Sequence, residues 1–225
     1  MIVAAMRERK PVADLTLTFD NGPEPAVTPA VLDVLARRAI RSTFFVVGSK
    51  IAGPEGRKLA ERAFAEGHWI GNHTWTHSLP LGYREPEAPA EEIGRTQAAI
   101  GGLAHPHKLF RPFGGGGRLH EGLLSRAAVD FLVRGRFTCV LWNAIPRDWD
   151  DPDGWVERAL TQCQSAPWVL MVLHDLPTGA MPHLDRFLDR ANEQGIRLRQ
   201  DFPPDCVPIV EGRIVLPMDD YVMPN

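Results

Sequence analysis

The acidic residue Asp20 ends a short segment in which apolar and polar side chains alternate. Leucine and phenylalanine alternate with threonine over residues 15–19, and the chain then turns at Gly22-Pro23. This alternation predicts a β-strand with two different faces. An acid at the carboxyl end of such a strand, followed by a turn, is where α/β enzymes place their chemistry. Asp20 is therefore the first candidate catalytic residue.

Two histidines, His73 and His77, lie at the end of a second strand-like segment, residues 68–74. Their spacing predicts that both imidazoles lie on one side of a helical turn, where they can hold one divalent ion. The alternative is a pair of histidines in a surface turn. Their position after a strand, which parallels that of Asp20, favours a metal site.

Arg111 precedes a run of four glycines, Gly114 to Gly117, at the end of a third apolar segment. Arginine can clamp a carboxylate through two hydrogen bonds. Glycines leave backbone N–H groups free to point at an oxyanion. The alternative is a structural arginine before a flexible loop.

His174 and Asp175 end the most apolar segment of the chain, residues 169–173. A histidine there can act at the mouth of a barrel, or it can be a hydrogen-bonded core residue, with Asp175 capping a turn. Upstream, Trp142 and Trp149 can line a wall on which the face of a pyranose ring stacks. Their alternative is an apolar hinge.

The elements that must position these residues alternate regularly between strand and helix. About seven such units predict a parallel sheet with crossover helices, and the absence of a dinucleotide-binding glycine motif favours a closed or distorted barrel. Thr28 is expected to be the N-cap of the first helix, with Pro29 as its first residue. Strands are predicted at 15–20, 42–48, 68–74, 109–113, 137–144 and 168–173, and helices at 28–38, 54–66, about 90–101, 121–129, 152–162 and 181–192.

The composition is that of one globular domain spanning residues 1–225, with 44% hydrophobic and 24% charged residues. The net charge of −3 does not indicate binding to nucleic acid or to an anionic membrane surface, both of which attract basic proteins. No apolar run approaches the roughly 18 residues of a membrane span. Three scattered cysteines predict reduced thiols, and the N-terminal segment is too short for a signal peptide. A cytoplasmic location is expected, and the oligomeric state is open.

Taken together, the order of these segments resembles the polysaccharide deacetylase family (the NodB-homology domain, carbohydrate esterase family 4). The resemblance covers about residues 12–198. The family motifs TFDDGP, H-(S/T)-x-x-H, Arg-Pro-x-x-Gly, D-x-x-D-W and L-H-D correspond to residues 18–23, 73–77, 111–115, 145–149 and 173–175.

The resemblance implies a distorted (β/α) barrel of the glycoside hydrolase/deacetylase type, with about seven parallel strands. It implies hydrolysis of an amide, usually an N-acetyl group on an amino sugar or oligosaccharide, with a divalent metal, typically zinc. The implied roles are Asp20 as general base, His73 and His77 as metal ligands, Arg111 as the partner of Asp20, the backbone N–H of Gly114 as an oxyanion donor, and His174 as the acid that protonates the departing amine.

Two positions depart from the family motifs. Asn21 stands where the family has a metal-binding aspartate, and an amide oxygen brings no negative charge, which predicts weakened or absent metal binding. Ile145 replaces the first aspartate of the fourth motif. An acid of that segment is implied to hold the catalytic histidine, so either Asp148 or Asp175 is expected to hold His174.

Three functional hypotheses remain open from the sequence. The first is metal-dependent N-deacetylation of an amino sugar. The second is a metal-independent cytoplasmic hydrolase of small amides or ureides, similar to an allantoinase. The third is a degenerate relative that binds saccharide without turnover, because Asn21 and Ile145 have replaced acids.

Overall fold

The computed structural model describes residues 13–224, and its centre is one nine-stranded mixed β-sheet. Strands β1 to β7 pair in parallel, and β8 and β9 are antiparallel. The strand order is β6-β1-β2-β3-β4-β5-β8-β9, with β7 also paired to β1. The strands are β1 (Asp14–Asp20), β2 (Thr43–Val46), β3 (Trp69–Asn72), β4 (Leu109–Phe110), β5 (Thr138–Cys139), β6 (Trp168–His174), β7 (Arg197–Arg199), β8 (Ile209–Val210) and β9 (Arg213–Ile214).

The long strand β1 organises the barrel. One edge of β1 pairs with β6 over its whole length, and the other edge is divided, with β7 on residues 14–16 and β2 on residues 18–20. Beyond β5, Ala144 forms a parallel bridge with Met171 of β6, which joins the two sides of the sheet. The predicted distorted (β/α) barrel with about seven parallel strands is therefore confirmed.

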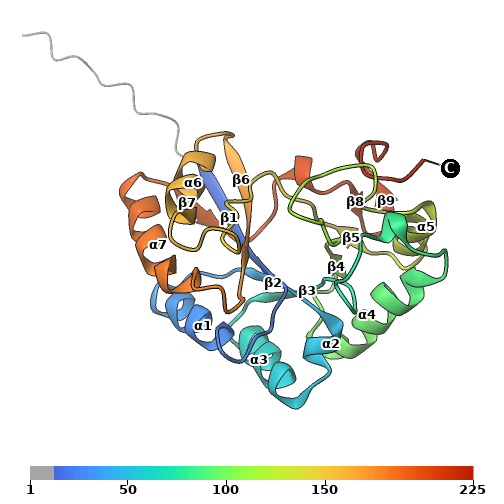
Figure 1. Cartoon of the computed structure of the whole chain (residues 1–225), viewed down its shortest axis with the longest axis horizontal. Helices are drawn as coiled ribbons and strands as arrows, with labels where there is room; N and C mark the ends of the chain where they lie inside the picture. The colour runs from blue at the N-terminus through green and yellow to red at the C-terminus, as the bar shows by residue number, and fades with distance from the viewer. Residues whose placement is uncertain (1–12, 225) are drawn as a thin grey trace, which may run out of the picture.

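Helices surround the sheet on its outer side (Figure 1). A π-helical turn (Ala90–Gly94) leads directly into one of them, α4. The α-helices are α1 (Thr28–Arg37), α2 (Gly48–Ile51), α3 (Pro54–Ala65), α4 (Arg95–Ile100), α5 (Arg126–Arg134), α6 (Trp155–Gln162) and α7 (Leu184–Glu193).

The alternation along β1 and β6 separates two hydrophobic clusters. Leu15, Leu17 and Phe19 pack in the cluster that includes α1, α6 and α7. Leu170 and Val172 of β6 belong to the second cluster, on the inner face of the sheet. Successive residues of a strand point to opposite faces, so the last residues of β1 and β6 continue the inner-facing series. The sheet thus presents both strand ends to the barrel interior.

Two predictions of helix boundaries need correction. Thr28 is the first residue of α1 and not its N-cap: its hydroxyl oxygen accepts the backbone N–H of Glu24, before the helix, and its hydroxyl donates to the buried carboxylate of Asp175. The helix predicted at 121–129 starts later, at Arg126, where Ser125 caps the backbone N–H of Ala128. The short elements α2, β7 and β8 were not predicted either; β7 is defined by its pairing with β1 and β8 by its pairing with β5, both distant in the sequence.

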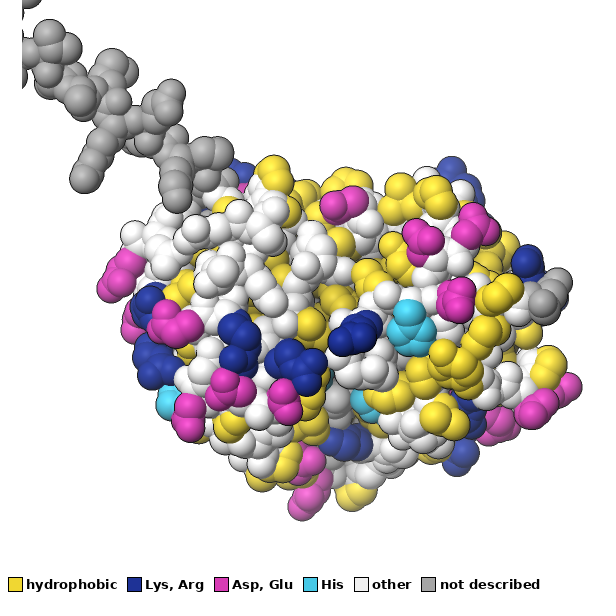
Figure 2. Space-filling model, turned by 45° about the horizontal axis from the view of Figure 1, so that its top comes forward, with side chains coloured by type: hydrophobic (Ala, Val, Ile, Leu, Met, Phe, Trp, Pro, Cys, Tyr) yellow, Lys and Arg dark blue, Asp and Glu magenta, His cyan; other side chains and the backbone are white. Residues whose placement is uncertain are grey.

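Charges on the surface are mixed in sign. On the face drawn in Figure 2, Lys and Arg side chains lie among Asp and Glu side chains. Many form ion pairs, such as that of Arg38 with Asp185. Over residues 13–224, no helix is both long and apolar enough to cross a membrane. The three cysteines are unbridged, as predicted.

Candidate active site

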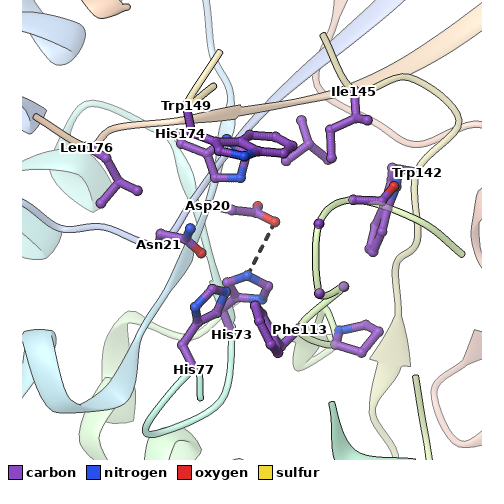
Figure 3. A pocket seen from close by; sticks show the side chains of 16 residues that line it. Asp20, Asn21, His73, His77, Phe113, Trp142, Ile145, Trp149, His174 and Leu176 are labelled. Carbon is purple, nitrogen blue, oxygen red and sulfur yellow. Dashed lines mark hydrogen bonds and ion pairs between the residues drawn. The ribbon is translucent and has the colours of Figure 1, made fainter. Parts of the chain in front are cut away.

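A pocket of about 250 Å³ opens at the carboxyl ends of the parallel strands. Asp20 ends β1 and His174 ends β6, and the two residues are direct partners in the register of these strands. His73 follows β3, and Arg111 follows β4. In Figure 3, Asp20 lies between His174 on one side and the histidine pair on the other. The fold therefore gathers the predicted residues at one place.

The carboxylate of Asp20 is held by a fully buried arginine. Asp20 is 3% exposed, and Arg111 Nη1 donates to its Oδ1 at 2.8 Å and to Thr18 Oγ1 at 2.6 Å. The other two guanidinium nitrogens also donate: Nε to the carbonyl oxygen of Val140 and Nη2 to that of Leu141. These bonds fix the arginine, so Asp20 keeps one oxygen on Arg111 and turns Oδ2 toward the pocket. The contact predicted for Arg111 is present, and its role in catalysis stays a prediction.

The imidazole of His73 is held in one tautomer. Its Nδ1 lies 2.9 Å from the carbonyl oxygen of Arg111, which can only accept a hydrogen bond, so Nδ1 carries the proton. Burial lowers the pKa of His73 to about 3, and the ring is therefore neutral at physiological pH. Its Nε2 lone pair then faces Asp20 Oδ2 at 3.4 Å (Figure 3). Two acceptor atoms that face each other suit a cation between or beside them.

His77 lies beside His73 but not on a helical turn. The ring centroids are 4.7 Å apart, and residues 73–77 form an irregular loop with left-handed backbone at Thr74 (φ 66°) and His77 (φ 50°). The predicted helical turn is wrong because the N–H groups of Trp75 and Thr76 bond to the Glu92 side chain. Burial, followed by the nearby His73, lowers the pKa of His77 to about 2. Both imidazoles are thus in the neutral form that binds metals.

Asn21 supplies a third donor atom at the pocket. Its backbone is left-handed (φ 74°), and its side-chain Oδ1 is buried without a hydrogen-bond partner. An unsatisfied buried carbonyl oxygen is costly unless a cation or water binds it. Within the described residues no three His, Cys, Asp or Glu side chains form a metal cluster, and the third donor at this pocket is an amide. Asn21, His73 and His77 together fit a divalent ion that accepts nitrogen and oxygen ligands.

The histidine on the opposite side, His174, is held by Asp148. Asp148 Oδ1 is 2.8 Å from His174 Nδ1, and its Oδ2 accepts the backbone N–H of His174 at 2.8 Å. Burial acts to lower the pKa of His174, but the hydrogen bond and charge of Asp148, with Asp20 and Asp175, raise it above its ordinary value. Of the two acids that the sequence left open, Asp148 therefore makes the contact.

Asp175 has a different environment. It is fully buried, its carboxylate bonds Thr28, and it packs against Gly22, where a β-carbon would lie 2.2 Å from Asp175 Oδ2. Burial raises the pKa of Asp175 to about 7. Asp175 thus packs against the turn that follows Asp20, and the hydrogen bonds to His174 come from Asp148.

The glycine-rich loop forms one side of the pocket against an apolar wall. A β-carbon on Gly114 would lie 2.6 Å from the Trp142 ring, and one on Gly117 would lie 2.6 Å from Ile145. Trp142 Nε1 also donates to the carbonyl of Gly117 at 3.1 Å. Ile145 therefore lies in the pocket wall and makes no polar contact of the kind an aspartate would make. Gly114 lines the pocket, and the role of its N–H stays a prediction.

Sequence reasoning missed two residues that hold the site. Thr18 bridges Arg111 and the carbonyl of Met171, and it lies on the same strand face as Asp20, so the alternation could have identified it. Glu92 binds the histidine loop from 16 or 17 residues further along the chain, and no local signal marks it.

Comparisons with known proteins agree with the arrangement of this site. A family model described as polysaccharide deacetylase matches residues 7–125. Chitooligosaccharide deacetylase from Rhizobium leguminosarum bv. phaseoli is 35% identical over 170 residues, which are 72% of this chain and 67% of the relative. Peptidoglycan-N-acetylmuramic acid deacetylase PdaC from Bacillus subtilis is 31% identical over 189 residues, which are 82% of this chain and 37% of that longer protein.

Solved structures show the same likeness. The structure of PdaC is 30% identical, with a TM-score of 0.66, over 83% of this chain and 87% of that chain. A family 4 carbohydrate esterase from Streptomyces lividans, in complex with acetate, shares the fold at 24% identity, with a TM-score of 0.71 over 87% of this chain and 96% of that chain. The chain accordingly belongs to the polysaccharide deacetylase family, and the relatives named deacetylases are hydrolases of carbon–nitrogen bonds other than peptide bonds.

Proposed function

We propose that this chain removes acetyl groups from an N-acetylated amino-sugar oligosaccharide with the help of a divalent metal. The observation that carries the proposal is the placement of Asp20 between the Asp148-held His174 and the neutral pair His73 and His77. An acid–base pair on two sides of one pocket, beside nitrogen and oxygen donors for a metal, is the set that amide hydrolysis needs.

Each polar group of the pocket then has a distinct task. When bound, the ion supplies Lewis acidity, which polarises a carbonyl and acidifies water. Asp20 accepts the proton of the attacking water through Oδ2, because Arg111 occupies Oδ1. His174 donates a proton to the departing amine, which is a poor leaving group when unprotonated. Asn21, His73 and His77 hold the metal.

The substrate class follows from the wall of the pocket and from the relatives. Trp142 and Trp149 line the pocket, and indole faces suit the apolar face of a pyranose ring. The R. leguminosarum and B. subtilis relatives bear the names of chitooligosaccharide and peptidoglycan deacetylases. Short N-acetylglucosamine oligomers are therefore the first substrates to test. A cytoplasmic location, expected from the sequence, belongs to the same proposal and is tested by cell fractionation.

The test is amine release from chito-oligosaccharides by protein purified without chelator. We expect activity that chelation removes and that added Zn²⁺ or Co²⁺ restores. A fully deacetylated oligosaccharide is the matched control, and allantoin tests the ureide alternative. Amine release that survives exhaustive chelation would favour the metal-independent alternative.

A second candidate, saccharide binding without turnover, is favoured by one observation. Asn21 brings no charge to the position of the third metal donor, so metal affinity is lower than an aspartate would give. Binding of chito-oligosaccharide with no amine release at any metal concentration would establish this alternative.

Asn21→Asp is expected to tighten Zn²⁺ binding at least tenfold, a gain of about 1.4 kcal/mol. The substitution places a negative charge where a buried, unpartnered Oδ1 now lies. Titration calorimetry of the metal-free protein measures the change. Asn192→Asp adds the same charge on the exposed side of α7 and should leave the affinity unchanged.

The identity of residue 21 in the purified protein must be checked in the same experiment. Asn21 precedes glycine, a sequence prone to deamidation, and intact mass with peptide mapping shows whether aspartate has already formed. If the variant binds Zn²⁺ no more tightly than a protein shown to carry asparagine, residue 21 does not contact the metal.

A further inference from the structure

Glu92 is a buried carboxylate outside the pocket, and the proposed chemistry does not use it. It is 2% exposed and lies on the π-helical turn Ala90–Gly94. Its Oε2 accepts the backbone N–H groups of Trp75 and Thr76, each at 2.9 Å. Its Oε1 accepts from Thr76 Oγ1 at 2.7 Å and pairs with Arg84 Nη2 at 3.1 Å. Every one of these partners except Arg84 lies between His73 and His77.

The loop that Glu92 binds has a backbone that its sequence does not favour. Thr74 and His77 are both left-handed, at φ 66° and φ 50°, and a β-branched residue such as threonine rarely adopts that conformation. Such strain costs on the order of 1–3 kcal/mol per residue and persists only where the surroundings over-determine it. The histidines owe their placement to this backbone, so something must hold it.

The same π-helical turn also holds the start of the loop. Asn72 Oδ1 accepts the backbone N–H of Thr74 at 3.1 Å, and Asn72 Nδ2 donates to the carbonyl of Ile93 at 2.9 Å. Glu92 and Ile93 are consecutive residues of the turn, so one element fixes residues 74, 75 and 76 together. π-Helical turns are rare in proteins overall, and those that do occur often lie at functional sites.

We propose that Glu92 is a positioning residue that holds His73 and His77 in the geometry that binds the metal, an inference that rests on the proposed function. A carboxylate is the side chain suited to this task, since its two oxygens offer about four acceptor sites and four donors converge on it. A glutamine of the same shape offers one acceptor oxygen and would turn an NH₂ group toward other donors. Glu92 touches the loop backbone and not the imidazoles, which makes its effect indirect.

The test compares Glu92→Gln with Glu91→Gln, the same change at the adjacent residue. The Glu91 side chain is 75% exposed, and its ion pair among residues 13–224 is with Arg95, one turn along the helix, at 3.8 Å. We expect Glu92→Gln to weaken Zn²⁺ binding to the metal-free protein by about 10- to 100-fold, the usual effect of losing an outer-shell partner. Glu91→Gln should bind like the unaltered protein. Circular dichroism confirms that both variants are folded.

The outcomes separate this inference from the proposed function. An unaltered protein that binds no Zn²⁺ overturns both, whereas Zn²⁺ affinity unchanged in folded Glu92→Gln overturns the inference alone. If Glu92→Gln does not fold, Thr76→Ala changes an exposed residue, removes one hydrogen bond to the carboxylate and should weaken binding in the same direction by a smaller factor. An unchanged affinity in Thr76→Ala would then count against the role of Glu92.

Discussion

Asp20→Asn is expected to lower kcat for amide hydrolysis by about 10³-fold, within the range that a general base supplies. Asparagine keeps the shape of the side chain and its contact to Arg111, but it cannot take a proton from water. Oligosaccharide binding should change little, because the indole rings of Trp142 and Trp149 that line the pocket are unaltered. Steady-state amine release at saturating metal measures the effect.

The substitution also affects folding, and this must be measured separately. Arg111 is fully buried and its charge is paired with Asp20, so removing that charge is expected to cost about 3–5 kcal/mol of stability. Asp14→Asn is the matched control, since Asp14 lies on the same strand and pairs with Arg197 and Arg199 at the far end of β1. Normal kcat in folded Asp20→Asn would remove Asp20 as the base.

Much of the barrel could be predicted because its information is local. The alternation of residues 15–19 identified β1 and the face that Asp20 continues. The apolar segment before His174 identified β6, and parallel pairing then requires the two strand ends to meet at one edge of the sheet. Family motifs add the roles of these residues, but their meeting point follows from strand order alone.

Other parts of the site depend on contacts that no local pattern encodes. His73 and His77 have a spacing that suggests a helix, yet Glu92 takes the N–H groups that a helix would use. Thr28 has the character of an N-cap, yet its hydroxyl bonds Asp175, which is far away in the sequence. In both cases a buried carboxylate distant in the sequence accepts from a donor of the segment, the N–H groups of the histidine loop in one and the Thr28 hydroxyl in the other, because a buried carboxylate needs hydrogen-bond donors.

The choice between Asp148 and Asp175 shows the same limit. Both acids lie within a few residues of family motifs, and spacing could not decide which one holds His174. The structure decides because Asp175 is committed to Thr28 and the Gly22 turn, whereas both oxygens of Asp148 face His174. The acid that protonates the amine therefore has one dedicated partner.

Removing that partner should give the second large effect. Asp148→Asn is expected to lower kcat by about 10²- to 10⁴-fold, because an asparagine NH₂ group disfavours the tautomer and the charged form of the histidine that the aspartate supports. Asp150→Asn is the matched control, since Asp150 is exposed in the same loop and pairs with Arg147. An activity like that of the control would show that His174 needs no partner.

The pH dependence gives a sharper signature than the rate. A general acid must be protonated, so activity is present below the pKa of His174 and falls as the pH rises through it. Asp148 raises that pKa against the opposing effect of burial, and its removal should therefore move the alkaline limb of the kcat profile to lower pH. The sign is the same for folding: a raised pKa stabilises the folded protein below the ordinary histidine pKa, and this is lost as the pH rises through the folded value. An alkaline limb that stays in place in Asp148→Asn would assign the proton to a group other than His174.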